Sequence, residues 1–120
     1  MEQKYSGSCH CGNVKFDVEL NLDDAIKCNC SLCSKKNAVM VRLPAEKFTM
    51  ISGEDSLGTY QWNTKVAKHH FCTNCGIYTF HRPRSAPELY GINLACLAGV
   101  DVNTLTPDIL NGAGLSLAGE

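Results

Sequence analysis

The sequence predicts a mainly β domain, and three observations lead to that fold class. Apolar and polar residues alternate from Val14 to Leu20, as they do in a strand with one buried face. Several other short runs rich in valine and aromatic residues are separated by turn residues. Seven of the eight cysteines fall in three short clusters, which suit tight turns between strands better than long helices.

The elements can be placed in chain order from these patterns. One short helical turn is expected after Ser31 as its N-cap, ending at Asn37, and a second over 101–105. Tyr60, Trp62 and Phe71 are expected in the core. The glycine-rich end, 111–120, is expected to be poorly ordered. The expected extended segments are 5–8, 14–20, 25–28, 38–43, 48–51, 57–62, 68–71, 77–81 and 90–98.

Length and composition predict one domain over residues 1–120, with a core of about 5–105. The net charge is −1 and no Lys/Arg block is present, so nucleic acid is not an expected partner. No signal-like N-terminus and no run of 18 apolar residues occurs. A cytoplasmic protein without a membrane partner is therefore expected. The oligomeric state stays open.

The cysteine spacing favours metal binding. In a reducing compartment, short-spaced cysteines typically bind metal, whereas a secreted, disulfide-stapled domain is the alternative. The pairs Cys9/Cys11 and Cys72/Cys75, with Gly76 allowing the second turn, would supply the four ligands of a structural zinc. Because 60 residues separate Cys11 from Cys72, such a site would tie the first strand to a late hairpin.

The run Cys28-Asn29-Cys30-Ser31-Leu32-Cys33 then has three thiols and no obvious fourth ligand. Three protein ligands with an open position are typical of catalytic zinc. A zinc ion bound by three thiolates is a poor Lewis acid for water, but its soft ligands suit a thiol as the fourth ligand. That thiol would be held as a nucleophilic thiolate. The alternative is a purely structural site closed by a histidine. The candidates are His10, His69, His70 and His81, with His70 expected beside the four-cysteine site because it shares a strand face with Cys72.

Three further residues need an interpretation: two lysines, for which a structural and a functional role are both open, and the eighth cysteine. Lys35 and Lys36 follow Cys33 directly and are either a solvated helical end or a binding site for a substrate carboxylate. Cys96 alternates with Ile92 and Leu94 and is expected to be a buried core thiol.

Taken together, the three cysteine motifs resemble the glutathione-dependent formaldehyde-activating enzyme family, also called the CENP-V/GFA domain. The resemblance runs from about Tyr5 to Leu105. It rests on Gly7-Ser8-Cys9-His10-Cys11-Gly12-Asn13-Val14-Lys15-Phe16, on Cys28-Asn29-Cys30-Ser31-Leu32-Cys33 and on Phe71-Cys72-Thr73-Asn74-Cys75-Gly76.

The resemblance implies a β-rich, Mss4-like fold of small antiparallel sheets with two zinc ions. It implies a structural ion on Cys9, Cys11, Cys72 and Cys75 and a catalytic ion on Cys28, Cys30 and Cys33. The implied activity is condensation of formaldehyde with glutathione, formally a carbon–sulfur lyase reaction in reverse. The chain is shorter than the founding enzymes and ends in a glycine-rich segment.

The sequence therefore predicts a zinc-dependent enzyme that adds a thiol to a small aldehyde, or runs the reverse reaction. Small thiol and aldehyde molecules are the expected partners. The alternative is a non-catalytic binding module in which both zinc ions are structural.

Overall fold

The computed structural model describes residues 2–61 and 65–110. Within them one α-helix occurs, α1 (Ser31–Lys36), together with five short 3-10 turns, η1 (Leu22–Asp24), η2 (Ala45–Lys47), η3 (Glu54–Ser56), η4 (Leu94–Cys96) and η5 (Val102–Thr104). The strands are β1 (Gln3–Ser8), β2 (Lys15–Leu20), β3 (Ile26–Cys28), β4 (Met40–Pro44), β5 (Phe48–Ser52), β6 (Leu57–Tyr60), β7 (Lys68–Cys72), β8 (Tyr78–Arg82), β9 (Leu89–Asn93) and β10 (Asp108–Leu110).

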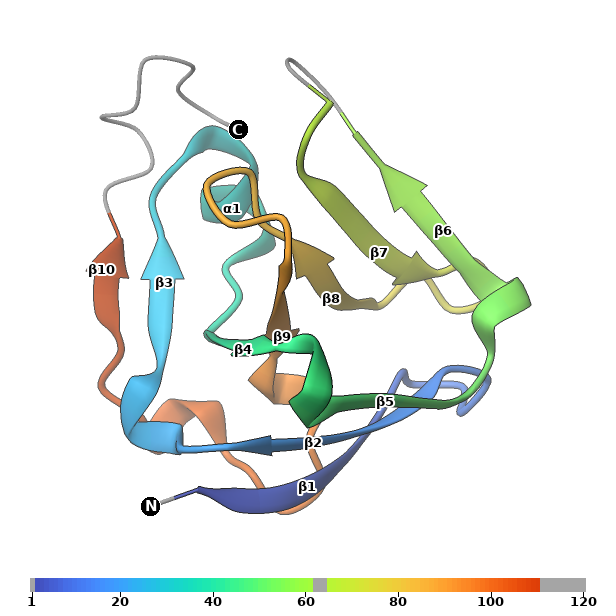
Figure 1. Ribbon diagram of the computed structural model, residues 1–120, viewed down its shortest axis with the longest axis horizontal. Helices are drawn as coiled ribbons and strands as arrows, with labels where there is room; N and C mark the ends of the chain where they lie inside the picture. The colour runs from blue at the N-terminus through green and yellow to red at the C-terminus, as the bar shows by residue number, and fades with distance from the viewer. Residues whose placement is uncertain (1, 62–64, 111–120) are drawn as a thin grey trace.

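These strands form two sheets, which confirms the mainly β fold class. A three-stranded sheet has the order β1-β2-β5, and a seven-stranded sheet has the order β10-β3-β4-β9-β8-β7-β6. The small sheet lies across the base of the larger one in Figure 1, and α1 lies at the opposite end of the view. The two ends of the large sheet therefore offer separate places for functional groups.

The core forms where the two sheets face each other. The alternation predicted for β2 is confirmed, since Phe16, Val18 and Leu20 are all buried. Phe16 stacks on Phe48 with ring centroids 5.6 Å apart, and Phe48 stacks on Tyr90 at 4.4 Å. Aromatic pairs of this kind add to the free energy gained by burying apolar area. This core holds β2 and β5 against β8 and β9.

The structure differs from the sequence prediction along β9, which ends at Asn93 rather than continuing to residue 98. The Asn93 side chain accepts a hydrogen bond from the backbone N–H of Ala95 and turns the chain into η4. Cys96 consequently lies on a turn and is half-buried, with its thiol donating to the carbonyl of Tyr78 at 3.4 Å. It packs against the core without being fully enclosed.

The edges of the large sheet also differ from expectation. Strand β10 was not predicted, and it pairs parallel with β3, whereas the other pairs of named strands are antiparallel. Tyr60 lies on the edge strand β6 and is 49% exposed, so its assignment to the core is wrong. The assignments for Trp62 and for 111–120 fall outside the described residues.

None of the helices in the described ranges is long and apolar enough to cross a membrane.

Candidate metal centres

The first cluster gathers Cys9 and Cys11 from the turn after β1 with Cys72, the last residue of β7, and Cys75 from the turn that follows it. All four Sγ atoms lie within 4.8 Å of one another. The Cys9 and Cys11 Sγ atoms are 3.6 Å apart, and those of Cys11 and Cys72 are 3.7 Å apart. The pairing of these four cysteines across the chain is thus present in the fold.

Local backbone geometry builds the first turn of this cluster. The Cys9 N–H donates to the Val14 carbonyl at 3.0 Å, and the Val14 N–H donates back to the Cys9 sulfur at 3.3 Å. Gly12 has a φ of +86°, a conformation that glycine adopts without strain. The turn is closed at both ends, so the two thiols project to one side.

The second turn repeats this arrangement at the tip of the β7–β8 hairpin. The Cys72 N–H donates to the Ile77 carbonyl at 3.0 Å, and the Gly76 N–H donates to the Cys72 carbonyl at 2.7 Å. Gly76 has a φ of +79°. The hairpin tip predicted from C-x-x-C-G is therefore formed.

Hydrogen bonds to sulfur favour the thiolate form of two cysteines in this first cluster, Cys75 and Cys11. At Cys72 the backbone N–H of Cys75 acts to lower the pKa, but burial and the thiols of Cys11 and Cys75 raise it to about 11 overall. The backbone N–H groups of Ile77 and Cys11 lower the pKa of Cys75 to about 6. The side chain of Asn74, with the backbone N–H of Asn13, lowers the pKa of Cys11. Thiolates are the form that binds a soft metal ion.

The second cluster consists of Cys28, Cys30 and Cys33, whose Sγ atoms also lie within 4.8 Å of one another. Cys28 is the last residue of β3, and Cys33 lies in the first turn of α1. The N-cap of α1 is Cys30 rather than Ser31, because the Cys30 sulfur accepts the Cys33 N–H at 3.4 Å. The helix ends at Asn37, as predicted, and this residue adopts the left-handed conformation.

Two of the three cysteines in this cluster are buried, although residues next to them in the sequence are exposed. Cys30 is 1% and Cys33 is 6% exposed, and both pack with Met40 in a small apolar group separate from the main core. Burial raises the pKa of Cys33. Burial also acts to raise the pKa of Cys30, but hydrogen bonds, led by the Cys33 backbone N–H, lower it overall.

No histidine joins either cysteine group, and all four histidines are among the described residues. The histidine-closed alternative for the second cluster is therefore not what the fold presents. His70 pairs with Thr59 Oγ1 at 3.1 Å and packs on Phe80.

The structure brings a polar layer against the second cluster that the sequence reasoning missed. Lys36 Nζ lies 3.0 Å from His69 Nδ1 and 3.7 Å above the centroid of the Tyr78 ring. His69 stacks on His81 at 5.4 Å, and Tyr78 Oη lies 2.6 Å from His81 Nδ1. Both histidines are at most 4% exposed. The sequence could have indicated the contact between the two histidines, because counting residues outward from the C-x-x-C-G turn places His69 opposite His81 in the hairpin.

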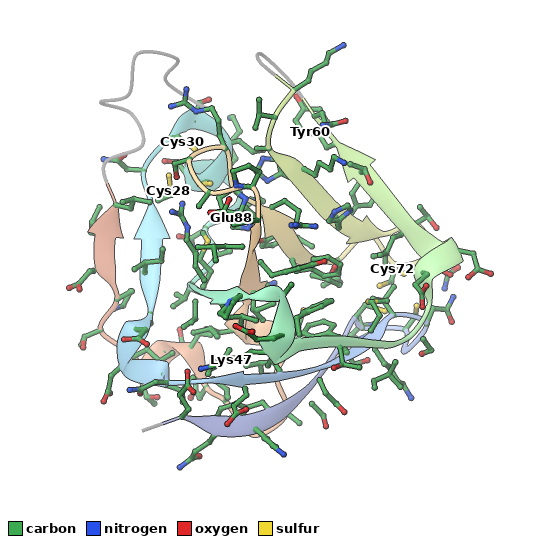
Figure 2. All side chains as sticks on the ribbon, in the orientation of Figure 1. Cys28, Cys30, Lys47, Tyr60, Cys72 and Glu88 are labelled. Carbon is green, nitrogen blue, oxygen red and sulfur yellow. The ribbon has the colours of Figure 1, made fainter. Side chains whose placement is uncertain are left out.

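The two clusters lie far apart on the molecule. In Figure 2, Cys28 and Cys30 lie near α1, while Cys72 lies at the other end of the large sheet, beside the turn after β1. Lys35, by contrast with Lys36, is exposed to solvent. Each cluster can therefore act without sharing ligands with the other.

A mainly β chain with two separate sulfur-rich groups that could hold metal ions defines a recognisable class of small domain. A family model described as glutathione-dependent formaldehyde-activating enzyme matches residues 4–110. The chain belongs to that family. A crystal structure of a protein from Rhodobacter sphaeroides is also similar, with 41% sequence identity and a TM-score of 0.82, covering 89% of this chain and 98% of that one.

Proposed function

We propose that this protein is a zinc enzyme of carbon–sulfur bond chemistry. It adds a thiol, glutathione being the one that the family description names, to a small aldehyde such as formaldehyde, or catalyses the reverse. The observation that carries the proposal is the group of Cys28, Cys30 and Cys33, which has no fourth protein ligand in the described part of the chain. A member of this family needs a place for a thiol, and three soft ligands provide one.

The donor set of the first cluster fits a structural zinc ion. Zn–S bonds of about 2.3 Å in a tetrahedron place neighbouring sulfurs about 3.8 Å apart. The spacings of 3.6 and 3.7 Å at Cys11 are close to that value. Four thiols gathered from two distant turns, two of them with a lowered pKa, have no comparable alternative use, so this ion is proposed to hold the two turns together.

The donor set of the second cluster fits a zinc ion, whose fourth tetrahedral position would then be left for a substrate thiol. When bound there, zinc supplies a soft cation that keeps a thiol ionised at neutral pH. Cys30 contributes a sulfur already supported by a backbone hydrogen bond, so its geometry is fixed by the start of α1. Lys35, exposed beside the cluster, is the proposed contact for a substrate carboxylate.

The reaction itself balances without a further reactant. A sulfur lone pair forms the C–S bond, the carbonyl π electrons move to oxygen, and a solvent proton completes the hydroxymethyl product. The reverse breaks the C–S bond and releases thiol and aldehyde. Because thiols add readily to formaldehyde in water, only a few kcal/mol of barrier lowering is required, on the order of 10²- to 10³-fold in rate.

The test is exchange-detected NMR of glutathione with formaldehyde, with and without the zinc-loaded protein. We expect the protein to accelerate exchange between free and hydroxymethylated thiol, Cys30→Ser to abolish the acceleration, and Cys96→Ser to retain it, since Cys96 belongs to neither cluster.

Native mass spectrometry supplies the second readout. Two zinc ions per chain, one of them perturbed by added glutathione, support the enzyme. Two ions that thiols leave untouched, with no acceleration, would establish the non-catalytic binding module instead.

A further inference from the structure

Lys36 lies one helical turn beyond Cys33 on the same face of α1, since positions i and i+3 are neighbours on a helix. Its ammonium group is directed into the protein, against the Tyr78 ring and His69 Nδ1. Lys35, the next residue back, is exposed. A cation drawn inward beside a group of thiols is costly unless negative charge compensates it.

The protonation states around Lys36 are set by burial. Burial, with the Lys36 charge, lowers the pKa of His69 to about 3, so this ring is neutral and accepts through Nδ1. Burial lowers the pKa of Lys36 to about 8, while Cys33, Cys30 and Cys28 act in the opposite direction. Lys36 therefore remains mainly a cation at neutral pH.

The groups that hold Lys36 are themselves fixed. Tyr78 Oη pairs with His81 Nδ1, and the His81 ring lies between His69 and Gly91. A Cβ at Gly91 would lie 2.2 Å from His81 Cε1, so only glycine leaves room for this ring. The position of the Lys36 ammonium is thus determined by three strands, β7, β8 and β9.

The negative charge expected at the neighbouring three-cysteine site would compensate the charge of Lys36. A divalent ion on three thiolates carries a net charge of −1, and a fourth thiolate makes it −2. Cys30 and Cys33 are almost fully buried, so solvent screens that charge poorly. The other charged or titratable groups that act on this layer are Arg42, His69, His70, His81 and Cys96. Burial holds the pKa of His69 and of His81 well below the usual range, so both rings are neutral.

We propose that Lys36 is a positioning residue that supplies the counter-charge for the three-cysteine site and for an anionic thiolate bound there. His69 and Tyr78 hold its ammonium group in place. The metal part of this role concerns the three cysteines alone, whereas the thiolate part rests on the proposed function. Lys36 is then an electrostatic partner of the site, and Lys35 retains the proposed contact with a substrate carboxylate.

The experiment uses the cobalt-substituted protein and the variants Lys36→Met, Lys36→Gln, Lys36→Arg and Lys35→Met. Chelator competition measures metal affinity, and titration with glutathione, followed through the sulfur-to-cobalt absorption band, measures thiol affinity. Circular dichroism checks folding. Lys36→Gln keeps a hydrogen-bond donor for His69 and serves where Lys36→Met does not fold.

We expect the neutral variants Lys36→Met and Lys36→Gln to weaken both affinities about 10- to 100-fold, the size expected for losing a unit charge that interacts with a partly buried site. Lys36→Arg, which keeps the charge and can still stack on Tyr78, should stay within about threefold of the native protein. Lys35→Met should leave the metal affinity unchanged.

Folded neutral variants with native affinities would overturn the proposal. So would equal losses in Lys36→Arg and Lys36→Met, since shape rather than charge would then matter. If the native protein shows no response to thiol while the neutral variants still lose metal affinity, the proposed function fails and the counter-charge role on the metal stands.

Discussion

The two cysteine clusters use the same ligand type but are built into the fold in different ways. The four-cysteine cluster joins two turns far apart in the sequence, and Cys9 and Cys72 belong to the main hydrophobic core. The three-cysteine cluster comes from one continuous run and packs in a small satellite group around Met40. We therefore expect the first arrangement to tie the fold together and the second to tolerate a change of ligand without unfolding the domain.

The largest effect should come from breaking the first cluster. In Cys72→Ser the link between the turns after β1 and β7 loses a ligand inside the core. Because a structural zinc contributes about 10 kcal/mol in small domains and total stability is of the same order, we expect loss of the cooperative unfolding transition. Differential scanning calorimetry measures it, with Cys96→Ser as control. A normal melting curve for Cys72→Ser would contradict the structural role.

Breaking the second cluster should cost much less. Cys30→Ser removes a thiol but keeps an oxygen that can cap α1, since serine is a good N-cap. We expect the variant to stay folded, with an unfolding free energy lowered by about 1–2 kcal/mol, and to bind one metal ion fewer. Denaturant titration and native mass spectrometry measure the two quantities. Unfolding comparable to that of Cys72→Ser would remove the contrast between the clusters.

The support beneath the second cluster can be tested through Gly91. Gly91→Ala forces the His81 ring to move, which we expect to cost about 1–3 kcal/mol and to weaken metal binding at the three-cysteine group. Gly58→Ala is the matched control, because its Cβ would lie 2.5 Å from the Phe71 ring, outside the Lys36 layer. Denaturant titration should show similar losses for the two variants, and chelator competition should separate them. Equal metal affinity in the two variants would show that the packing of His81 on Gly91 does not support the three-cysteine site.

The last prediction concerns acid. His69 has a folded-state pKa of about 3, below its unfolded value of 6.5, so the unfolded chain binds the proton more readily. Its contribution is fully present above pH 6.5 and is lost as pH falls towards 3, by up to about 1.4 kcal/mol per unit.

We therefore expect His69→Gln to flatten the fall in unfolding free energy between pH 6.5 and 4.5, measured by urea titration. His10→Gln, at an exposed side chain, should follow the native curve. Identical pH slopes for His69→Gln and the native protein would show that this ring titrates freely.

Much of this architecture could be predicted from local patterns. The alternation in β2, the turn at Gly76 and the end of α1 at Asn37 each depend on a few neighbouring residues and were predicted correctly. The end of β9 was missed, because the choice between strand and turn there depends on Asn93 capping η4. The parallel edge strand β10 was missed because three residues carry too little periodicity to predict a strand.

The sequence by itself determined how the cysteines group within each short motif, since short spacings bring thiols together whatever the surrounding fold. The fold brings Cys9 and Cys11 to Cys72 and Cys75. Only the tertiary structure decided the surroundings of the second group. Lys36, His69 and Tyr78 come from separate segments, and no local pattern distinguishes a buried lysine from an exposed one such as Lys35. Strand pairing and burial fix that choice, because they set both the distance between charges and the solvent that screens them.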